Sequence, residues 1–359
     1  MNIGFDAKRY FHNQTGLGNY SRDLINELIK GNPNDQFYLF DKKPSTNDFP
    51  QNTHVISPKK KLYLWREHGI IKDIESNNID VFHGLSNEIP FGKWNSNIKK
   101  VVTIHDAIFK AFPSYYPLLD RTIYNFKTKH AINNSDKIIC TSNATANQLK
   151  HYYNANSDKL ITIYQTCHSS HWEIYTENQI NAFKIKYQLQ HPFILYLSSF
   201  QKRKNHLNLL ISLKKTQNKN IHLVFAGKGN ETLNSCKQYC AENNLNNQVT
   251  FIHDIPLSDL PLLYRSANAF IYPSLIEGFG IPLIEAACAR LPIAASEIEV
   301  FKEIAPKDTI YFNPNDPDSI ASSLESLHHR NDKIDYSLEL EKFNKTNTAN
   351  QVYQLYKSM

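Results

Sequence analysis

The chain lacks the long apolar runs that a membrane-spanning helix requires. None of its hydrophobic segments approaches the ~20 consecutive apolar residues that cross a bilayer, and its mean hydropathy is −0.49. Met1–Asp6 follows the pattern of a strand and lacks the charged-then-apolar layout of a secretion signal. We therefore expect a cytoplasmic protein. The basic clusters that favour at most a weak peripheral association with an anionic membrane are Lys59–Lys61, Lys99–Lys100, and Arg121 with Lys127 and Lys129.

Cysteine is also scarce, with five scattered residues in 359. An odd and scattered set argues against a disulfide framework. Cys236 and Cys240 stand four residues apart on a predicted helix, but no further ligands stand at a matching spacing, so buried thiols are the simpler interpretation. We expect no metal site. The net charge is only +6, and no basic stripe is interleaved with aromatic residues, so nucleic-acid binding is not expected.

Two common enzyme signatures are missing. A dinucleotide-binding fingerprint needs three glycines in the pattern G-x-G-x-x-G directly after a strand. Here Gly16 and Gly18 come well after the first predicted strand, and Ser21 stands where the third glycine belongs. No serine or cysteine lies in a recognisable nucleophile-elbow sequence, so a hydrolytic triad is not expected.

Strand-like apolar runs alternate with helix-like segments along nearly the whole chain. This alternation is typical of parallel sheets covered by helices on both faces, and twelve strands are too many for one open sheet here. We predict an α/β fold with two Rossmann-like domains, residues 1–175 and 176–344, linked through the weakly patterned Tyr175–Pro192. The predicted strands are Ile3–Asp6, Gln36–Phe40, Val81–His83, Val101–His105, Lys137–Thr141, Leu160–Ile163, Phe193–Ser198, His222–Ala226, Val249–Ile252, Ala269–Tyr272, Ile293–Ala295 and Thr309–Phe312.

A glycine-rich turn in the second half is the most informative segment. The predicted strand Ala269–Tyr272 comes just before it, and the predicted helix Ile281–Ala289 follows with Pro282 in its first turn, where a missing N–H is harmless. Gly278 and Gly280 leave the backbone N–H groups at the helix start uncovered. Such a helix start favours an anion such as phosphate.

Two carboxylates flank this turn, Glu277 in the loop and Glu285 in the helix. A phosphate at the amides and sugar hydroxyls at the carboxylates are what a nucleotide-sugar requires. The alternative is an ordinary strand–turn–helix with a solvated glutamate at its mouth. The complete pattern of glycines, proline and carboxylates favours a binding site.

Polar residues follow other predicted strands, at the carboxyl ends where parallel sheets bind ligands. His105 and Asp106 follow the fourth strand, and the histidine reads equally well as a core residue or as a site residue. Asn87 or Glu88, after the third strand, could contact an acceptor, although simple turn chemistry explains them as well. Lys202–Lys204, between a strand and a helix, suits a pyrophosphate, whereas on a random surface it would be a solvated patch.

Taken together, these motifs resemble those of the retaining glycosyltransferases of family 4, in the order that the family has them. Glu277 to Glu285 resembles the E-x7-E motif, and Thr103–Asp106 resembles the segment whose histidine faces the donor sugar. Arg203–Asn205 resembles the family's Arg-Lys-Asn element, and Thr15–Tyr20 its first glycine-rich loop. The resemblance implies a GT-B fold, in which two Rossmann-like domains face each other across a cleft and a final helix, here 345–359, crosses back onto the first domain.

The resemblance also implies roles for single residues. Lys204 would clamp the donor diphosphate, Glu285 would hold the ribose, Glu277 would contact the donor sugar, and His105 would orient it. Many members carry an arginine where this chain has Ser198, which leaves open whether Arg203 takes over that phosphate contact. Further donor contacts are expected at Gly16, Gly18, Gly227, Asp254, Ile255, Phe279, Gly280 and Ile281.

The function implied is transfer of a hexose-type sugar from a GDP- or UDP-sugar to a glycan, a lipid-linked acceptor or another acceptor, in surface polysaccharide synthesis. The donor is a substrate, and neither a metal nor a further cofactor is expected. Two alternatives stay open. One is a non-catalytic protein that binds a nucleotide-sugar or NAD, and the other is a glycoside hydrolase that uses Glu277 and Glu285 as acid and base.

Overall fold

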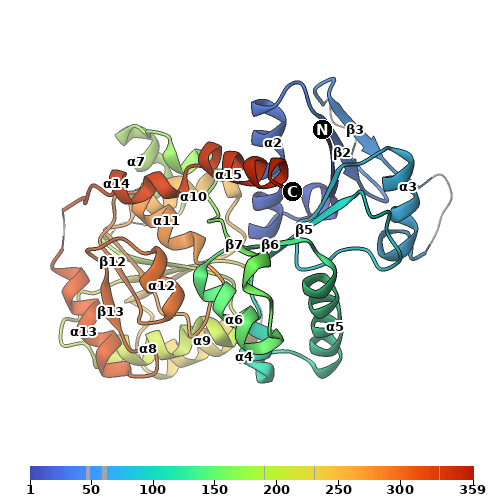
Figure 1. The fold of residues 1–359 in the computed structure, drawn as a ribbon. Helices are drawn as coiled ribbons and strands as arrows, with labels where there is room; N and C mark the ends of the chain where they lie inside the picture. Colours follow the sequence, from blue (N-terminus) through green and yellow to red (C-terminus); the bar gives the residue numbers. More distant parts are fainter. Residues whose placement is uncertain (46–48, 59–62, 190, 230, 331) are drawn as a thin grey trace. The chain divides into compact units, whose positions relative to one another are not determined.

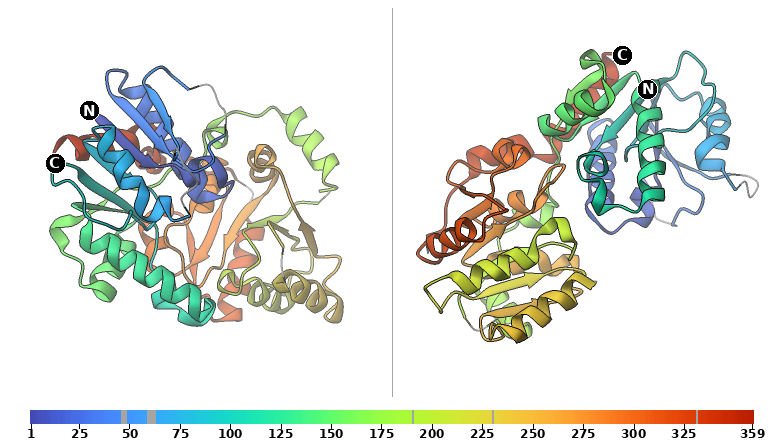
Figure 2. Two further views of the ribbon diagram at one scale, coloured as in Figure 1. Left: turned by 90° about the vertical axis from the view of Figure 1, so that its right-hand side faces the viewer. Right: turned by 90° about the horizontal axis from the view of Figure 1, so that it is seen from below.

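The computed structural model describes the chain except for residues 46–48, 59–62, 190, 230 and 331. The chain divides into two compact units. Unit 1 comprises Met1–Thr166 and Lys342–Met359, and unit 2 comprises Cys167–Glu341 (Figures 1 and 2). The basic cluster Lys59–Lys61 lies outside the described residues. Within the described ranges, no helix combines the length and the apolar character needed to span a bilayer.

Unit 1 is built on a seven-stranded parallel sheet with the strand order β3-β2-β1-β4-β5-β6-β7. Its central strands are buried almost throughout, as expected of strands covered on both faces. The strands are β1 (Asn2–Asp6), β2 (Gln36–Phe40), β3 (Thr53–Ile56), β4 (Val81–Gly84), β5 (Lys99–Ile104), β6 (Lys137–Cys140) and β7 (Leu160–Thr162).

The helices of unit 1 connect these strands and close its core. They are α1 (Lys8–His12), α2 (Gly16–Gly31), α3 (Ile70–Ser76), α4 (Ile108–Ala111), α5 (Leu118–Asn134), α6 (Asn143–Tyr153) and α15 (Lys345–Lys357). A π-helical turn, η1 (Trp65–Gly69), leads into α3.

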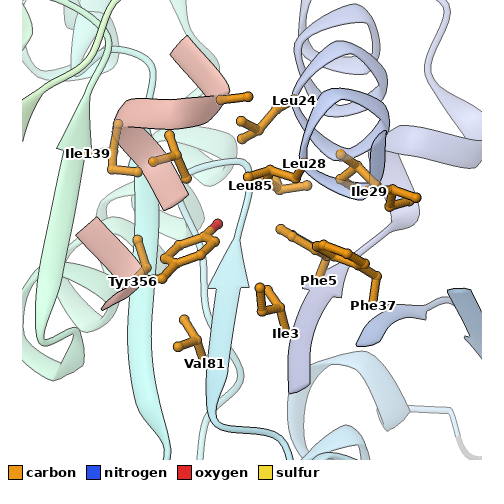
Figure 3. Packing of buried hydrophobic residues seen from close by; sticks show 14 of the residues in the cluster. Ile3, Phe5, Leu24, Leu28, Ile29, Phe37, Val81, Leu85, Ile139 and Tyr356 are labelled. Atoms are coloured by element: carbon orange, nitrogen blue, oxygen red, sulfur yellow. The ribbon is translucent and has the colours of Figure 1, made fainter. Parts of the chain in front are cut away.

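The last helix, α15, packs on α2 and completes the hydrophobic core of unit 1. Val352, Leu355 and Tyr356 belong to the same buried cluster as β1 and α2, and Figure 3 shows the Tyr356 ring among these side chains. The Tyr356 hydroxyl also lies 2.6 Å from Nδ1 of the buried His83, whose Nε2 lies 2.8 Å from the Thr103 hydroxyl. Hydrogen bonds and apolar contacts together therefore attach the end of the chain to unit 1.

Unit 2 contains a six-stranded parallel sheet with the order β10-β9-β8-β11-β12-β13. Its strands are β8 (Ile194–Leu197), β9 (Leu223–Ala226), β10 (Val249–Ile252), β11 (Ala269–Tyr272), β12 (Ile293–Ser296) and β13 (Ile310–Phe312). Its helices are α7 (Glu177–Lys186), α8 (His206–Lys215), α9 (Glu231–Glu242), α10 (Leu260–Ser266), α11 (Ile281–Cys288), α12 (Glu299–Ile304), α13 (Pro317–His328) and α14 (Ser337–Leu340). All five cysteines of the chain are buried.

The structure differs from the sequence-based expectation at two places. The expected linker Tyr175–Pro192 contains α7, and the division between the units lies earlier, after Thr166. A capping box between Thr176 and Gln179 starts this helix, although its apolar pattern is weak. The edge strand β3 was not predicted, because all of its side chains are only half-buried and it lacks a continuous apolar run.

Each sheet has one point at which the strand order reverses, and ligands of open parallel sheets bind beyond the strand ends at such a point. In unit 1 it lies between β1 and β4, and in unit 2 between β8 and β11. The segments that follow β1, β8 and β11 carry many of the predicted site residues, whereas His105 follows β5, next to β4.

Candidate active site

The glycine-rich turn of unit 2 joins β11 to α11. Gly280 has a φ of +117°, in the left-handed region that favours glycine. A β-carbon at this position would lie 2.8 Å from the ring of Phe301. Ile281, the next residue, begins α11, and Pro282 lies in its first turn. Gly280 thus allows the loop after β11 to turn into a helix whose positive end stands at the reversal point of the sheet.

We expect Gly280→Ala to lower the free energy of unfolding by about 1–3 kcal/mol, because the new side chain would be strained in both backbone and packing. Urea denaturation measures the effect. Gly31→Ala is the matched control, since a β-carbon at Gly31 meets nothing within 4 Å and its φ is not positive. Equal unfolding midpoints for the two variants would show that the turn is not constrained in this way.

Glu277 is a buried carboxylate held between two cations. Its Oε1 accepts hydrogen bonds from Lys204 Nζ and, at 3.0 Å, from the Tyr272 hydroxyl, and its Oε2 lies 3.1 Å from a guanidinium nitrogen of Arg203. Burial alone would raise the pKa of Glu277, but the two cations outweigh it and lower this pKa to about 2. Glu277 is therefore ionised at neutral pH, and the three side chains together carry one net positive charge.

The two cations come from the 3₁₀ turn η5 (Lys202–Lys204), which follows β8. The backbone N–H of Leu275 donates to the Arg203 carbonyl at 2.9 Å, so this turn is attached to the loop after β11. Asn205 follows with a φ of +65°, and its side-chain amide donates to the Pro314 carbonyl at 2.7 Å. Lys204 is buried whereas Lys202 is exposed, so the fold directs one of these two lysines inward.

Glu285 on α11 has a different set of partners. The Tyr264 hydroxyl donates to its Oε2 at 2.7 Å, and Nε2 of the buried His171 lies 3.4 Å from its Oε1. Burial lowers the pKa of His171, although Glu285 opposes this effect, so the ring is neutral at pH 7. The side chain of Glu285 keeps 12% of its surface exposed. A pre-oriented carboxylate with a free edge is well suited to accept hydrogen bonds from hydroxyl groups.

His105 lies in unit 1, buried at the end of β5. Its Nε2 donates to the Leu85 carbonyl at 2.9 Å, and its Nδ1 accepts from the Gln165 side-chain amide at 3.0 Å. Burial lowers the pKa of His105 to about 4, so the ring is neutral at pH 7. Both ring nitrogens have protein partners, and His105 would exchange one of these hydrogen bonds in order to contact a sugar directly.

A cavity of about 420 Å³ opens beside His105, at the carboxyl ends of β1, β4 and β5. Arg66 crosses its wall and binds Asp6 at 2.6 Å and Glu88 at 2.5 Å, and Lys127 binds Glu88 at 2.7 Å. Aromatic and aliphatic side chains form another part of the wall. The charged and polar residues that also line the cavity are Lys8, Arg9, Glu67, Asn87 and Asp106, and the aromatic and aliphatic ones are Phe109, Tyr116, Ile123 and Tyr124. We call this space the unit-1 pocket.

Gly16 and Gly18 lie in the first turn of α2, and Gly227 lies in the loop after β9. A β-carbon at Gly18 would lie 1.8 Å from the Asn13 carbonyl oxygen, and one at Gly227, where φ is +146°, would lie 1.9 Å from the Ser198 carbonyl oxygen. Gly16 is exposed, with open space around it. The Ser198 hydroxyl lies 3.1 Å from Nε2 of His206. Gly18 and Gly227 are therefore required by close backbone contacts whether or not a ligand is bound, whereas Gly16 is not.

The other predicted contacts differ in exposure. Phe279 is buried, Ile255 and Ile281 are half-buried, and Asp254 is exposed with a φ of +51°. The structure thus joins Glu277 with Lys204 and Arg203 in unit 2, gives Glu285 its own partners there, and places His105 in unit 1. Sequence reasoning missed Tyr264, Tyr272, His171 and Gln165, and only Tyr272, at a strand end beside the motif, could have been found from its position.

Each of the two units matches a known protein family. The family described as "Glycosyl transferases group 1" matches residues 177–345, and the family described as "Glycosyltransferase Family 4" matches residues 15–167. The first match contains the cluster around Glu277 and also Glu285, and the second contains His105.

Similar proteins include two bacterial enzymes of O-antigen synthesis. The chain is 27% identical over 237 residues to the O-antigen chain mannosyltransferase RfbU of Salmonella typhimurium. The matched region covers 66% of this chain and 62% of RfbU. It is 24% identical over 350 residues to the O-antigen chain mannosyltransferase B of Escherichia coli, with 90% of each chain covered. With RfbU the match thus spans less than two thirds of the relative.

Solved structures share the fold at low sequence identity. HepE from Anabaena, solved in complex with UDP and glucose, has a TM-score of 0.76 at 13% identity. The match covers 100% of this chain and 100% of HepE. Sucrose-phosphate synthase from Thermosynechococcus elongatus has a TM-score of 0.77 at 18% identity, covering 100% of this chain and 98% of the synthase. The two parallel-sheet units therefore have the GT-B fold, and with the family matches on both of them the chain belongs to the glycosyltransferases of family 4.

Proposed function

We propose that the protein transfers a hexose-type sugar from a GDP- or UDP-sugar to a glycan or lipid-linked acceptor, with retention of configuration, in the synthesis of a surface polysaccharide. The observation that carries this proposal is the cationic cluster of unit 2. Lys204 and Arg203 surround one buried carboxylate, carry one net positive charge with it, and share a sheet end with the start of α11. A diphosphate leaving group would complement this charge.

The mechanism that we propose is electrostatic. The bond between the anomeric carbon and the diphosphate oxygen breaks, and the acceptor oxygen bonds to the same face of that carbon. The acceptor proton passes to the leaving phosphate oxygen. Lys204, Arg203 and the amides near Phe279, Gly280 and Ile281 would stabilise the growing negative charge, and this role requires no metal ion or further cofactor.

The remaining site residues would bind the two substrates. Glu285, oriented by Tyr264, would accept hydrogen bonds from the ribose hydroxyls, and Glu277 would contact hydroxyls of the donor sugar. The unit-1 pocket, with its mixed charged and aromatic wall, would receive the acceptor. The mannosyltransferase names of the two O-antigen relatives favour mannose as the hexose and a polysaccharide as the product.

The two cations paired with Glu277 argue against the glycoside hydrolase alternative. A hydrolase of this kind needs one carboxylic acid that is protonated near the working pH. The ion pairs lower the pKa of Glu277 to about 2, so in a hydrolase Glu277 would be the ionised partner and Glu285 would have to be the acid. A hydrolase would also leave the cations around Glu277 without a purpose. An NAD-binding protein is disfavoured by the late glycine pair and by Ser21.

The proposal is tested by calorimetric titration of the protein with GDP, UDP, ADP and NAD. The protein is then incubated with GDP-mannose or UDP-glucose, a mannose-terminated oligosaccharide as acceptor, and EDTA. We expect tight binding of one nucleoside diphosphate and release of that diphosphate from its sugar donor despite EDTA. NMR of the product should show the anomeric configuration of the donor. Binding of NAD alone, or of no nucleotide, would refute the transferase assignment, and an inverted product would refute the retaining mechanism.

A further inference from the structure

The amino-terminal part of α5 carries large apolar side chains that stand in solvent. Leu118, Leu119 and Phe126 are 68%, 71% and 64% exposed, and Ile123 is 43% exposed. With about 100° between successive residues, these four side chains fall within about 140° of the helix circumference. The buried residues of α5, which include Ala131 and Ile132 and face the core of unit 1, lie on the opposite side. Single exposed apolar residues are ordinary, but a row of them on one helix face marks an interaction surface.

Cations border this apolar row. Lys110 and Arg121 line a hollow of about 400 Å³ between α4 and α5, together with Phe109 and Pro113. Within the described part of the chain, neither Lys110 nor Arg121 forms an ion pair, whereas Lys127 is paired with Glu88. Asp120 is the one carboxylate in the sequence of α5, and its position lies outside the apolar arc. We call the exposed residues Leu118, Leu119, Ile123 and Phe126, with Lys110, Arg121 and Lys129, the α5 surface.

We propose that the α5 surface docks on a bilayer that contains anionic phospholipid. The cations would meet lipid phosphates at the headgroup level, with Lys110 and Arg121 on either side of the hollow. The leucines and Phe126 would enter the boundary between headgroups and acyl chains, as the apolar face of an interfacial helix does. Charge favours this occupant, because the surface joins apolar side chains to cations that lack an ion-pair partner within the described residues.

The position of Ile123 links the α5 surface to the unit-1 pocket. Ile123 belongs to the exposed row and also lines the pocket, and Tyr124 beside it lines the same pocket. A bilayer bound to α5, labelled in Figure 1, would therefore lie next to the pocket mouth. If the pocket receives the acceptor, as the proposed function requires, an acceptor anchored in that bilayer could reach it without leaving the membrane surface. The docking itself does not depend on that function.

The test is co-sedimentation of the full-length protein with vesicles of pure phosphatidylcholine and with vesicles that also contain phosphatidylglycerol. We expect binding to the anionic vesicles, little binding to the neutral ones, and loss of binding as salt is raised. The double variant Leu118→Ser/Leu119→Ser should lower the partition coefficient about tenfold or more, because it removes two of the inserted side chains. The double variant Lys110→Glu/Arg121→Glu should abolish the preference for anionic lipid.

The matched control is Ile185→Ser/Leu338→Ser, which removes two side chains of unit 2 that are 79% and 80% exposed. This variant should bind vesicles as the wild type does. Circular dichroism checks that all variants are folded, and the substituted leucines, being exposed, should not alter the unfolding midpoint. Absence of wild-type binding, binding without lipid preference, or unchanged binding of the α5 variants would each overturn the proposal, and would leave a protein partner as the occupant of this surface. Nucleotide titration without vesicles reports on the proposed function separately.

Discussion

Replacing Lys204 with alanine is expected to lower kcat by about 10²–10³-fold, which corresponds to ~3–4 kcal/mol of transition-state stabilisation. The lysine is buried beside Glu277 and Tyr272, so its charge is fixed in place before the donor binds. Without it, the local charge falls from one net positive to zero, and the leaving diphosphate loses a preorganised partner. Release of nucleoside diphosphate from the sugar donor, measured over a range of donor concentrations, separates kcat from KM.

Lys202→Ala is the control for this experiment. It removes the same kind of side chain from the same 3₁₀ turn, but Lys202 is exposed, and it should leave kcat nearly unchanged. Lys204→Ala also leaves Arg203 as the one cationic partner of Glu277 among the described residues, so the urea midpoint should be measured alongside the rates. A folded Lys204→Ala variant with full activity would contradict the proposed mechanism.

Glu285→Ala is expected to weaken binding of the preferred nucleoside diphosphate about 10–100-fold, because hydrogen bonds to a charged group are worth about 1.5–3 kcal/mol. The loss should appear in the dissociation constant of the nucleotide itself, since the proposed contact is to the ribose and not to the transferred sugar. Calorimetric titration measures it directly.

Two further variants sharpen this result. Tyr264→Phe removes the hydroxyl that holds Glu285 at 2.7 Å and should give a smaller loss in the same direction. Glu242→Ala removes an exposed glutamate of α9 that bonds only Gln238 among the described contacts, and it should bind the nucleotide as the wild type does. Equal affinities for the wild type and Glu285→Ala would remove Glu285 from the site.

The strands were largely predictable from the sequence because of how parallel sheets are buried. Strands covered on both faces need continuous apolar runs, and β11, which is buried throughout, has the bounds that its run predicts. The apolar runs of β2 and β10 also predict their bounds, although these strands are only partly buried. The edge strand β3 was missed for the same reason, since it is only half-buried and has no such run. Helix α7 was missed because its start is set by a local capping box and not by apolar periodicity.

The candidate site was predictable in its local motifs but not in its pairings. The glycines and proline around Gly280 constrain the backbone within a few residues, so the turn and the start of α11 follow from the sequence. That Lys204 and Arg203 pair with Glu277 depends on β8 and β11 being neighbours, and this strand order is not encoded in any short motif. The contact of His171 with Glu285 likewise joins residues more than a hundred positions apart.

The packing of α15 on unit 1 constrains the order in which the two units can fold while the protein is being synthesised. Residues 342–359 complete the core of a unit whose other residues end at Thr166, and all of unit 2 is translated in between. Unit 2 is therefore a continuous segment that can fold as it leaves the ribosome. The hydrophobic core of unit 1, in contrast, cannot be completed before Val352, Leu355 and Tyr356 have been synthesised. The apolar face that these residues cover stays exposed until residues 342–359 have been translated. The first half of the chain is therefore the part that needs protection from aggregation for the longest time.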